Sequence, residues 1–282
     1  MVNLPDMLTS DGCELRYADS GGPGRAVVFT HGAGADHHMF DQQFSSLAAD
    51  GHRVVVWDMR AHGESARSVA PFTRARALRD LAALITHLGL VEPVVAGHSL
   101  GGNLTQALVQ EEPHRFAGII VMDSTWNSGP LTRTERFALR LAVPSLALIP
   151  ARSLPRVMAR ASAVTPSARD DATRAFSQMS KRQFIEVWRA AVTFLDPNPT
   201  YRTPITLCLL RGAADKTGNI ATAMPLWAAA EGVAEHVVPG AGHLVTQDAP
   251  DLVTAIIREF LDGLRPANLG PASSGSLERA EP

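Results

Sequence analysis

Short apolar runs alternate along the chain with stretches whose apolar residues recur at helical spacing. Several runs are unbroken, which is typical of parallel strands buried on both faces. The runs are Glu14–Ala18, Ala26–Thr30, Arg53–Trp57, Pro93–Ala96, Gly118–Met122, Ile205–Leu210 and Glu235–Val238. The clearest helical stretches are Arg74–Leu88, Leu100–Glu111 and Pro250–Leu264. Strands that alternate with helices predict an α/β fold with a doubly wound, mostly parallel sheet.

The alternation stops between residues 126 and 201. Seven prolines divide this segment into short helical pieces, and we find no strand pattern in it. We interpret it as an inserted helical cap, with a further hidden strand of the sheet as the alternative. The predicted organisation is an α/β core of residues 1–125 and 202–264, a cap of residues 126–201, and a tail of residues 265–282. The tail is rich in Pro, Gly and Ser, which is typical of disorder.

Composition narrows the class of partner. The 282 residues carry a formal net charge of -2, so we expect no broad basic field for nucleic acid or acidic lipid. The longest apolar stretch, Leu141–Ala151, is too short to span a bilayer, and the N-terminus lacks the pattern of a secretory signal. We therefore expect a cytoplasmic protein without a nucleic-acid partner or stable membrane insertion. The sequence gives no signal of the oligomeric state.

Metal and cofactor motifs do not stand out. The two cysteines lack a CxxC spacing, and neither zinc-hydrolase motifs nor a phosphate-binding GxxxxGK[ST] loop occurs. The expected cofactor is none, and the expected metal is none.

A glycine-flanked serine follows one of the predicted strands. Residues Gly97–Gly101 read G-H-S-L-G and fit the pattern G-x-S-x-G, between an apolar strand and a helical stretch. Glycines suit both ends, because a side chain there would collide with neighbouring backbone. Such a turn exposes the Ser99 hydroxyl and places the Leu100 N–H at a helix N-terminus, where partial positive charge favours an anion. The pattern predicts a nucleophilic serine.

This segment resembles the nucleophile elbow of the α/β-hydrolase superfamily, and three further segments match that family in its order. His31–Gly34 follows a predicted strand, as the family's oxyanion loop does. Trp57–Ser65 resembles the family's D-x-R-G-x-G-x-S turn, with Ala61 where glycine is usual. Gly240–His243 resembles the loop of the catalytic histidine. The resemblance extends over about residues 10–264, and the cap is its least specific part.

A serine hydroxyl is a poor nucleophile without a positioned base. Among ten histidines, His243 lies in a glycine-flanked loop after the last predicted strand, and it completes the family's order of serine, acid and histidine. The resemblance places the acid at Asp215, after a strand and a turn. Asp123, which ends the preceding strand, is the alternative, because some members of the family carry the acid there.

The resemblance also implies an oxyanion hole made of the backbone N–H groups of Ala33 and Leu100. Around it we expect a mainly apolar pocket that suits a small, neutral or weakly polar acyl compound. The residues expected to line this pocket are His37, His38, Met39, Phe40, Trp126 and Leu244.

These features predict a serine hydrolase that cleaves an ester-type bond (a carboxylic ester, lactone or thioester) through an acyl-enzyme. Perhydrolysis, acyl transfer and carbon–carbon cleavage are alternatives on the same triad. A ligand-binding protein with negligible turnover is another, because a fold alone does not fix a function. A serine at the elbow argues against dehalogenases and epoxide hydrolases, whose relatives in the family carry aspartate there.

Overall fold

A computed structural model describes residues 4–66 and 70–264, so the predicted disordered tail of residues 265–282 lies outside the described residues. Its eight-stranded sheet has the order β1-β2-β4-β3-β5-β6-β7-β8. The strands are β1 (Asp6–Leu8), β2 (Glu14–Asp19), β3 (Ala26–Thr30), β4 (Arg53–Trp57), β5 (Val94–His98), β6 (Gly118–Met122), β7 (Thr206–Gly212) and β8 (Glu235–Val238). β1 pairs antiparallel with β2, and β2 pairs antiparallel with β4. The other pairs are parallel, which confirms the predicted fold class.

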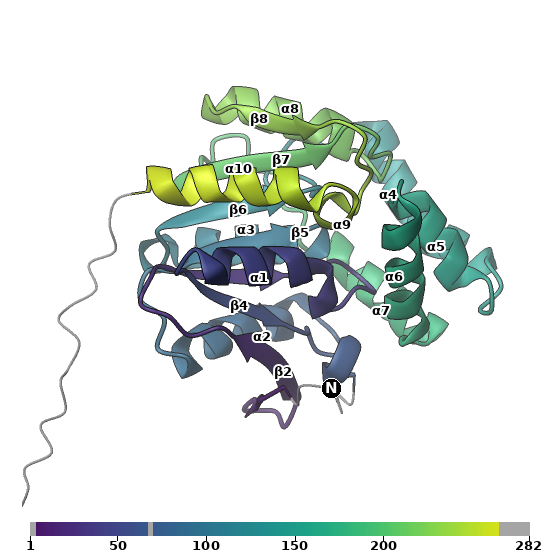
Figure 1. Ribbon diagram of the computed structural model, residues 1–282. Helices are drawn as coiled ribbons and strands as arrows, with labels where there is room; N and C mark the ends of the chain where they lie inside the picture. Colours follow the sequence, from purple (N-terminus) through teal and green to yellow (C-terminus); the bar gives the residue numbers. More distant parts are fainter. Residues whose placement is uncertain (1–3, 67–69, 265–282) are drawn as a thin grey trace, which may run out of the picture.

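Helices cover both faces of the sheet (Figure 1). One face packs on α1 (Asp41–Ala49) and α10 (Pro250–Gly263), and the other on α2 (Arg74–His87), α3 (Leu100–Glu111) and α8 (Ile220–Glu231). Every residue of β3, β5 and β6 is buried, because these central strands present apolar side chains to both layers. The short helices are η1 (His37–Phe40), η2 (Gly63–Ser65), η3 (Pro113–Arg115) and α9 (Val245–Asp248).

Four helices lie between β6 and β7, in the segment of residues 126–201 that was predicted as a cap and is called the cap below. They are α4 (Arg133–Leu148), α5 (Leu154–Ser162), α6 (Pro166–Ser177) and α7 (Lys181–Val192). Residues 126–201 are all described, and none of them forms a strand. Figure 1 shows the four helices together at one end of the sheet. No helix of the described ranges is long and apolar enough to cross a bilayer.

The prolines break the cap less than the sequence indicates. α4 begins with a capping box between Thr132 and Glu135 and continues through Pro144 for 16 residues. Pro155 and Pro166 lie in the first turns of α5 and α6, where a missing N–H removes no helical hydrogen bond.

Two carboxylates of the core hold the cap in place. Buried Asp36 accepts both hydrogen bonds of a bidentate pair from Arg174 of α6, with N···O distances of 2.6 and 2.9 Å. Burial alone would raise the pKa of Asp36, but the Arg174 guanidinium lowers it below its ordinary value. Asp248 accepts hydrogen bonds from the backbone N–H groups of Val164 and Thr165 between α5 and α6. These hydrogen bonds attach α6 and the segment between α5 and α6 to the core.

Candidate active site

The turn between β5 and α3 holds Ser99 in a strained conformation. Ser99 has φ 52° and ψ -117°, a region that L-residues rarely adopt. A Cβ at Gly97 would collide with the backbone of Gly101, and one at Gly101 would collide with the carbonyl of Thr30. The glycines therefore let the chain turn sharply enough to lift the serine above the sheet. Strain of this kind is often stored at functional sites.

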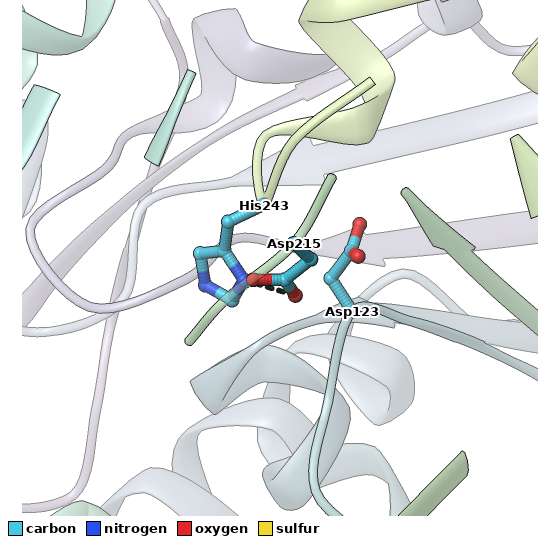
Figure 2. Close-up of side chains that lie close together, drawn as sticks. All are labelled: Asp123, Asp215 and His243. Atoms are coloured by element: carbon cyan, nitrogen blue, oxygen red, sulfur yellow. Dashed lines mark hydrogen bonds and ion pairs between the residues drawn. The ribbon is translucent and has the colours of Figure 1, made fainter. Parts of the chain in front are cut away.

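His243 and Asp215 complete a hydrogen-bonded line that ends on this serine. The Ser99 Oγ lies 3.0 Å from the His243 Nε2. The His243 Nδ1 lies 2.9 Å from the Asp215 Oδ2, the contact drawn as a dashed line in Figure 2. Asp215 also accepts a hydrogen bond of 2.7 Å from the backbone N–H of Thr217. The side chains of Asp215 and His243 are buried, so solvent screens this contact little.

The two candidate acids lie beside each other, but they differ in what they touch. Burial alone would raise the pKa of Asp215, yet its hydrogen bonds and the charge of His243 lower it to about 2. Asp123 is fully buried, and burial together with the negative charge of Asp215 raises its pKa well above the ordinary range. Its Oδ1 accepts a hydrogen bond from the Gly212 N–H. Its Oδ2 is buried and has no hydrogen-bond partner among the described residues. Asp215 is thus the acid whose pKa is lowered by its contact with the imidazole, and Asp123 is the neighbouring acid whose pKa is raised by burial.

One group of side chains in the described ranges has the composition of a cation site. Ligand atoms of Asp123, Asp215 and His243 lie within 4.8 Å of one another. The His243 Nδ1 is engaged with Asp215, however, and its Nε2 faces Ser99. A metal at this place would have to displace the contact between the imidazole and the carboxylate, so the group fits a carboxylate that orients an imidazole better than a metal centre.

The loop after β3 is fixed by a buried histidine. The His31 Nδ1 lies 2.8 Å from the Gly32 carbonyl, and its Nε2 accepts a hydrogen bond of 3.0 Å from the Met59 N–H. Since the second bond uses Nε2 as acceptor, the Nδ1 carries the proton. Burial lowers the pKa of His31 and favours this neutral form. The histidine thereby orients the segment that presents the Ala33 N–H.

A second buried histidine supports the site from behind. The His98 Nε2 lies 2.6 Å from the backbone carbonyl of His243, and the two rings have centroids 4.8 Å apart. A carbonyl accepts only, so Nε2 is the donor. Burial lowers the pKa of His98 to about 3, which keeps its imidazole neutral beside that of His243. His98 therefore anchors the loop that carries His243 without adding a charge.

Two cavities meet at Ser99. The first has a volume of about 300 Å³ and lies between α3, α4 and α7. Its wall is mainly apolar and includes Leu139, Ala142, Trp188 and Val192. One end is polar: the Asn219 amide donates a hydrogen bond of 2.8 Å to Glu135 and accepts one of 3.0 Å from Thr125. This chain of contacts also ties the first turn of α4 to the core.

The second cavity has a volume of about 590 Å³ and shares Trp188 with the first. It contains His243 and is lined by residues of α4 and α5, including Leu146 and Met158. Ser99, Ala33 and Trp188 line both cavities, and Leu100 lines the first. Ala33 and Leu100, the residues expected to supply the oxyanion donors, therefore line the same space as Ser99. The two cavities offer room for the groups on either side of a scissile bond.

Most of the side chains expected in the pocket lie elsewhere. Leu244 lines the second cavity, and Met39 lines only a small hollow beside it. The structure places the other four outside both cavities at Ser99. His37 pairs with buried Asp58, His38 pairs with Asp41 at the surface, Phe40 packs on Phe29, and Trp126 stacks on Trp227.

The residues that replace them come mainly from the cap. Leu139, Met158, Phe176 and Trp188 line the cavities, whereas other apolar cap residues face solvent. The sequence shows that the cap is apolar but does not show which face of each helix turns inward. Asn219 carries a better signal, because it follows β7 at the edge of the sheet where the elbow lies.

Comparison with known proteins decides the family. The profile of the Alpha/beta hydrolase family matches residues 27–256. The chain belongs to this family. The match confirms the resemblance seen in the elbow and the loops, and it makes the protein an α/β hydrolase.

Curated relatives match over part of their length. A non-heme haloperoxidase of Rhodococcus erythropolis is 38% identical over 99 residues, which is 35% of this chain and 36% of the relative. The 3-oxoadipate enol-lactonase 2 of Acinetobacter baylyi is 31% identical over 130 residues, 46% of this chain and 48% of the relative. The matched region thus covers about half or less of the length of each of these relatives.

Solved structures match over nearly the whole chain. An esterase from Thermogutta terrifontis has a TM-score of 0.71 at 26% identity and covers 93% of this chain and 97% of its own. The enol-lactonase from Burkholderia xenovorans has a TM-score of 0.76 at 19% identity, and the match covers 92% of this chain and 100% of the lactonase. At that identity the second likeness shows the fold alone.

Proposed function

We propose that the protein is a serine hydrolase that cleaves a carboxylic ester, lactone or thioester of a small, mainly apolar substrate. The observation that carries the proposal is the 3.0 Å contact between the Ser99 Oγ and the His243 Nε2 at the meeting point of two cavities. In this proposal Ser99 is the nucleophile, His243 the general base, and Asp215 the acid that orients the imidazole.

Acylation follows from this geometry. The Ser99 oxygen attacks the carbonyl carbon of the substrate while its proton passes to the His243 Nε2. The carbonyl oxygen gains the negative charge and accepts hydrogen bonds from the Ala33 and Leu100 N–H groups. When the tetrahedral intermediate collapses, the alkoxide or thiolate leaves with the proton from His243. The serine is left as an acyl ester.

Deacylation repeats these steps with water. His243 takes a proton from a water molecule, whose oxygen attacks the acyl carbon, and the same two N–H groups stabilise the oxyanion. Collapse expels the Ser99 oxygen, which recovers its proton from His243, and the carboxylic acid leaves. Asp215 stays ionised throughout, because its lowered pKa lies far below neutral pH.

The cavities support a small acyl substrate. A volume of about 300 Å³ with an apolar wall suits a short aliphatic or aromatic group, and the polar end near Asn219 suits a single polar substituent. The names of the enol-lactonase and esterase relatives agree with an ester-type bond.

A fluorophosphonate probe tests the nucleophile directly. We expect stoichiometric labelling at Ser99, a burst of p-nitrophenol from p-nitrophenyl acetate, and loss of both in Ser99→Ala. The fall in kcat is expected to be about 10⁴ to 10⁶. Ser124→Ala, at a buried serine whose hydroxyl bonds the Ser99 carbonyl, is the matched control and should keep the label. A folded protein that releases no burst would instead support the ligand-binding alternative.

The haloperoxidase relative favours a second candidate function. Hydrogen peroxide in place of water would convert the acyl-enzyme to a peracid and free serine, and the peracid would oxidise a halide outside the site. Monochlorodimedone bromination with acetate, bromide and peroxide measures this activity. Its dependence on acetate and on Ser99 would separate it from direct oxidation by peroxide.

A further inference from the structure

The cap carries a charge opposite to that of the core. Residues 126–201 contain eleven Lys and Arg against five Asp and Glu, a net charge of +6. The remainder of the chain has fifteen against twenty-three, a net charge of -8. The overall charge of -2 therefore hides a strong separation. The expectation of no basic field holds for the average of the molecule but fails for this part of it.

The positive charge is concentrated on two consecutive helices and the turn between them. Six arginines between residues 133 and 160 are all exposed: Arg133, Arg136, Arg140, Arg152, Arg156 and Arg160. Within the described ranges, none of them is in an ion pair. One acidic residue, Glu135, lies among them, and its carboxylate bonds Thr132 and Asn219 instead. The arginines are thus available to an outside anion.

Large apolar side chains stand between these arginines. Leu148 is 85% exposed, Phe137 63% and Leu141 46%, and the three share one face of α4 because they follow at intervals of four and seven residues. Val157 of α5 is 43% exposed. Together the six arginines and these four residues are called the basic face of the cap.

We propose that the basic face docks on a membrane surface that contains anionic lipid. Arginines that flank exposed Phe and Leu side chains match the interfacial region of a bilayer, where charge meets headgroups and apolar groups enter the acyl boundary. The charge complementarity is specific to this face, because the core carries the opposite sign. Figure 1 shows α4 and α5 in the cap, at one end of the sheet.

The position of the basic face links docking to the site. The inner sides of α4 and α5 line the second cavity, through Leu146 and Met158, and Arg160 belongs both to that cavity and to the basic face. A docked protein would therefore present this cavity near the lipid headgroups. Apolar substrates dissolved in the membrane would have a short path to Ser99.

Vesicle flotation tests the proposal on the intact protein. We expect binding to vesicles of phosphatidylcholine with about 30% phosphatidylglycerol, little binding to phosphatidylcholine alone, and release at about 1 M salt. Arg136→Gln combined with Arg140→Gln should weaken binding about 25-fold, because each basic side chain near such a surface contributes about fivefold. Phe137→Ser should weaken it roughly tenfold through lost apolar burial.

Matched variants on the core isolate the effect. Arg79→Gln with Arg202→Gln removes the same charge, and Leu226→Ser removes a side chain that is 58% exposed on α8. Both should bind as the parent does, and every variant should keep its turnover of p-nitrophenyl acetate. Equal binding to neutral vesicles, or equal losses in the core variants, would overturn the proposal. A dimer in light scattering that Phe137→Ser dissociates would also overturn it, since the face would then be covered by a second copy of the chain.

Discussion

Asp123 and Asp215 lie side by side at the ends of adjacent strands, and only Asp215 touches the imidazole of His243 (Figure 2). Two buried carboxyl groups this close do not both ionise readily. The carboxyl group that accepts the hydrogen bond from His243 has a lowered pKa, and that of its buried neighbour is raised.

The first prediction separates the two acids by activity. Asp215→Asn should lower kcat by about 10⁴, because the amide favours the wrong imidazole tautomer while the fold persists. Asp123→Asn should lower it less than about tenfold, since the hydrogen bond of His243 goes to Asp215 and not to Asp123. Steady-state kinetics on a p-nitrophenyl ester give both values. If the two losses are reversed, the acid belongs to the end of β6.

The second prediction concerns the pH dependence of stability at Asp123. Its pKa in the folded protein is raised well above 3.8. Between pH 3.8 and that raised pKa, the folded state holds a proton that the unfolded chain has released. Fewer protons on the unfolded state mean that stability falls as pH rises above 3.8. Asn does not titrate, so Asp123→Asn should gain stability relative to the parent as pH rises, by at most about 1.4 kcal/mol per pH unit.

Urea unfolding at about pH 5 and pH 8 measures this difference. Asp170→Asn, at an exposed acid of the cap, is the control and should show no such trend. A stability difference for Asp123→Asn that is constant with pH would show that Asp123 ionises normally in the folded protein.

The third prediction concerns buried His62, which should make stability rise with pH where Asp123 makes it fall. Burial lowers the pKa of His62 to about 3 from the ordinary 6.5. Between these values the unfolded chain binds a proton that the folded protein does not, so stability is lost as pH falls from 6.5 toward 3. His62→Gln should flatten this loss, and His114→Gln, at an exposed position, should not. Thermal unfolding at about pH 5 and pH 7 checks both; parallel curves for His62→Gln and the parent would contradict the prediction.

The sequence predicts the strand ends well for a local reason. An apolar strand followed by G-x-S-x-G needs a particular turn, and parallel strands bring their carboxyl ends to one edge of the sheet. Ser99, Asp215 and His243 follow β5, β7 and β8, so their meeting is a consequence of strand order. β1 was not predicted, because its three residues are too few to show an alternation of apolar and polar side chains.

The wall of the site could not be read in the same way. Trp126 follows β6 closely and was expected in the pocket, but it stacks on Trp227, which is about a hundred residues away in the chain. α4 carries apolar residues on its inner side, such as Leu146, and on its outer side, such as Leu148. Periodicity alone does not distinguish these faces, because both look like the buried side of an amphipathic helix.

The last prediction assigns substrate selectivity to the inner face of the cap. Leu139 lines the first cavity and Trp188 lines both, whereas Val157 lines neither and is 43% exposed. Leu139→Ala and Trp188→Ala enlarge the space beside Ser99, so kcat/KM should rise for longer acyl chains relative to short ones. One methylene in an apolar pocket changes discrimination by roughly tenfold or more, and each variant should shift the preferred chain length accordingly.

Val157→Ala is the matched control and should keep the parental profile. A series of p-nitrophenyl esters, with folding verified by circular dichroism, gives the comparison. If Leu139→Ala and Trp188→Ala lower kcat/KM by the same factor at every chain length, the cap contributes to stability and not to selectivity. Selectivity would then lie in the core loops that carry Ala33 and Asn219.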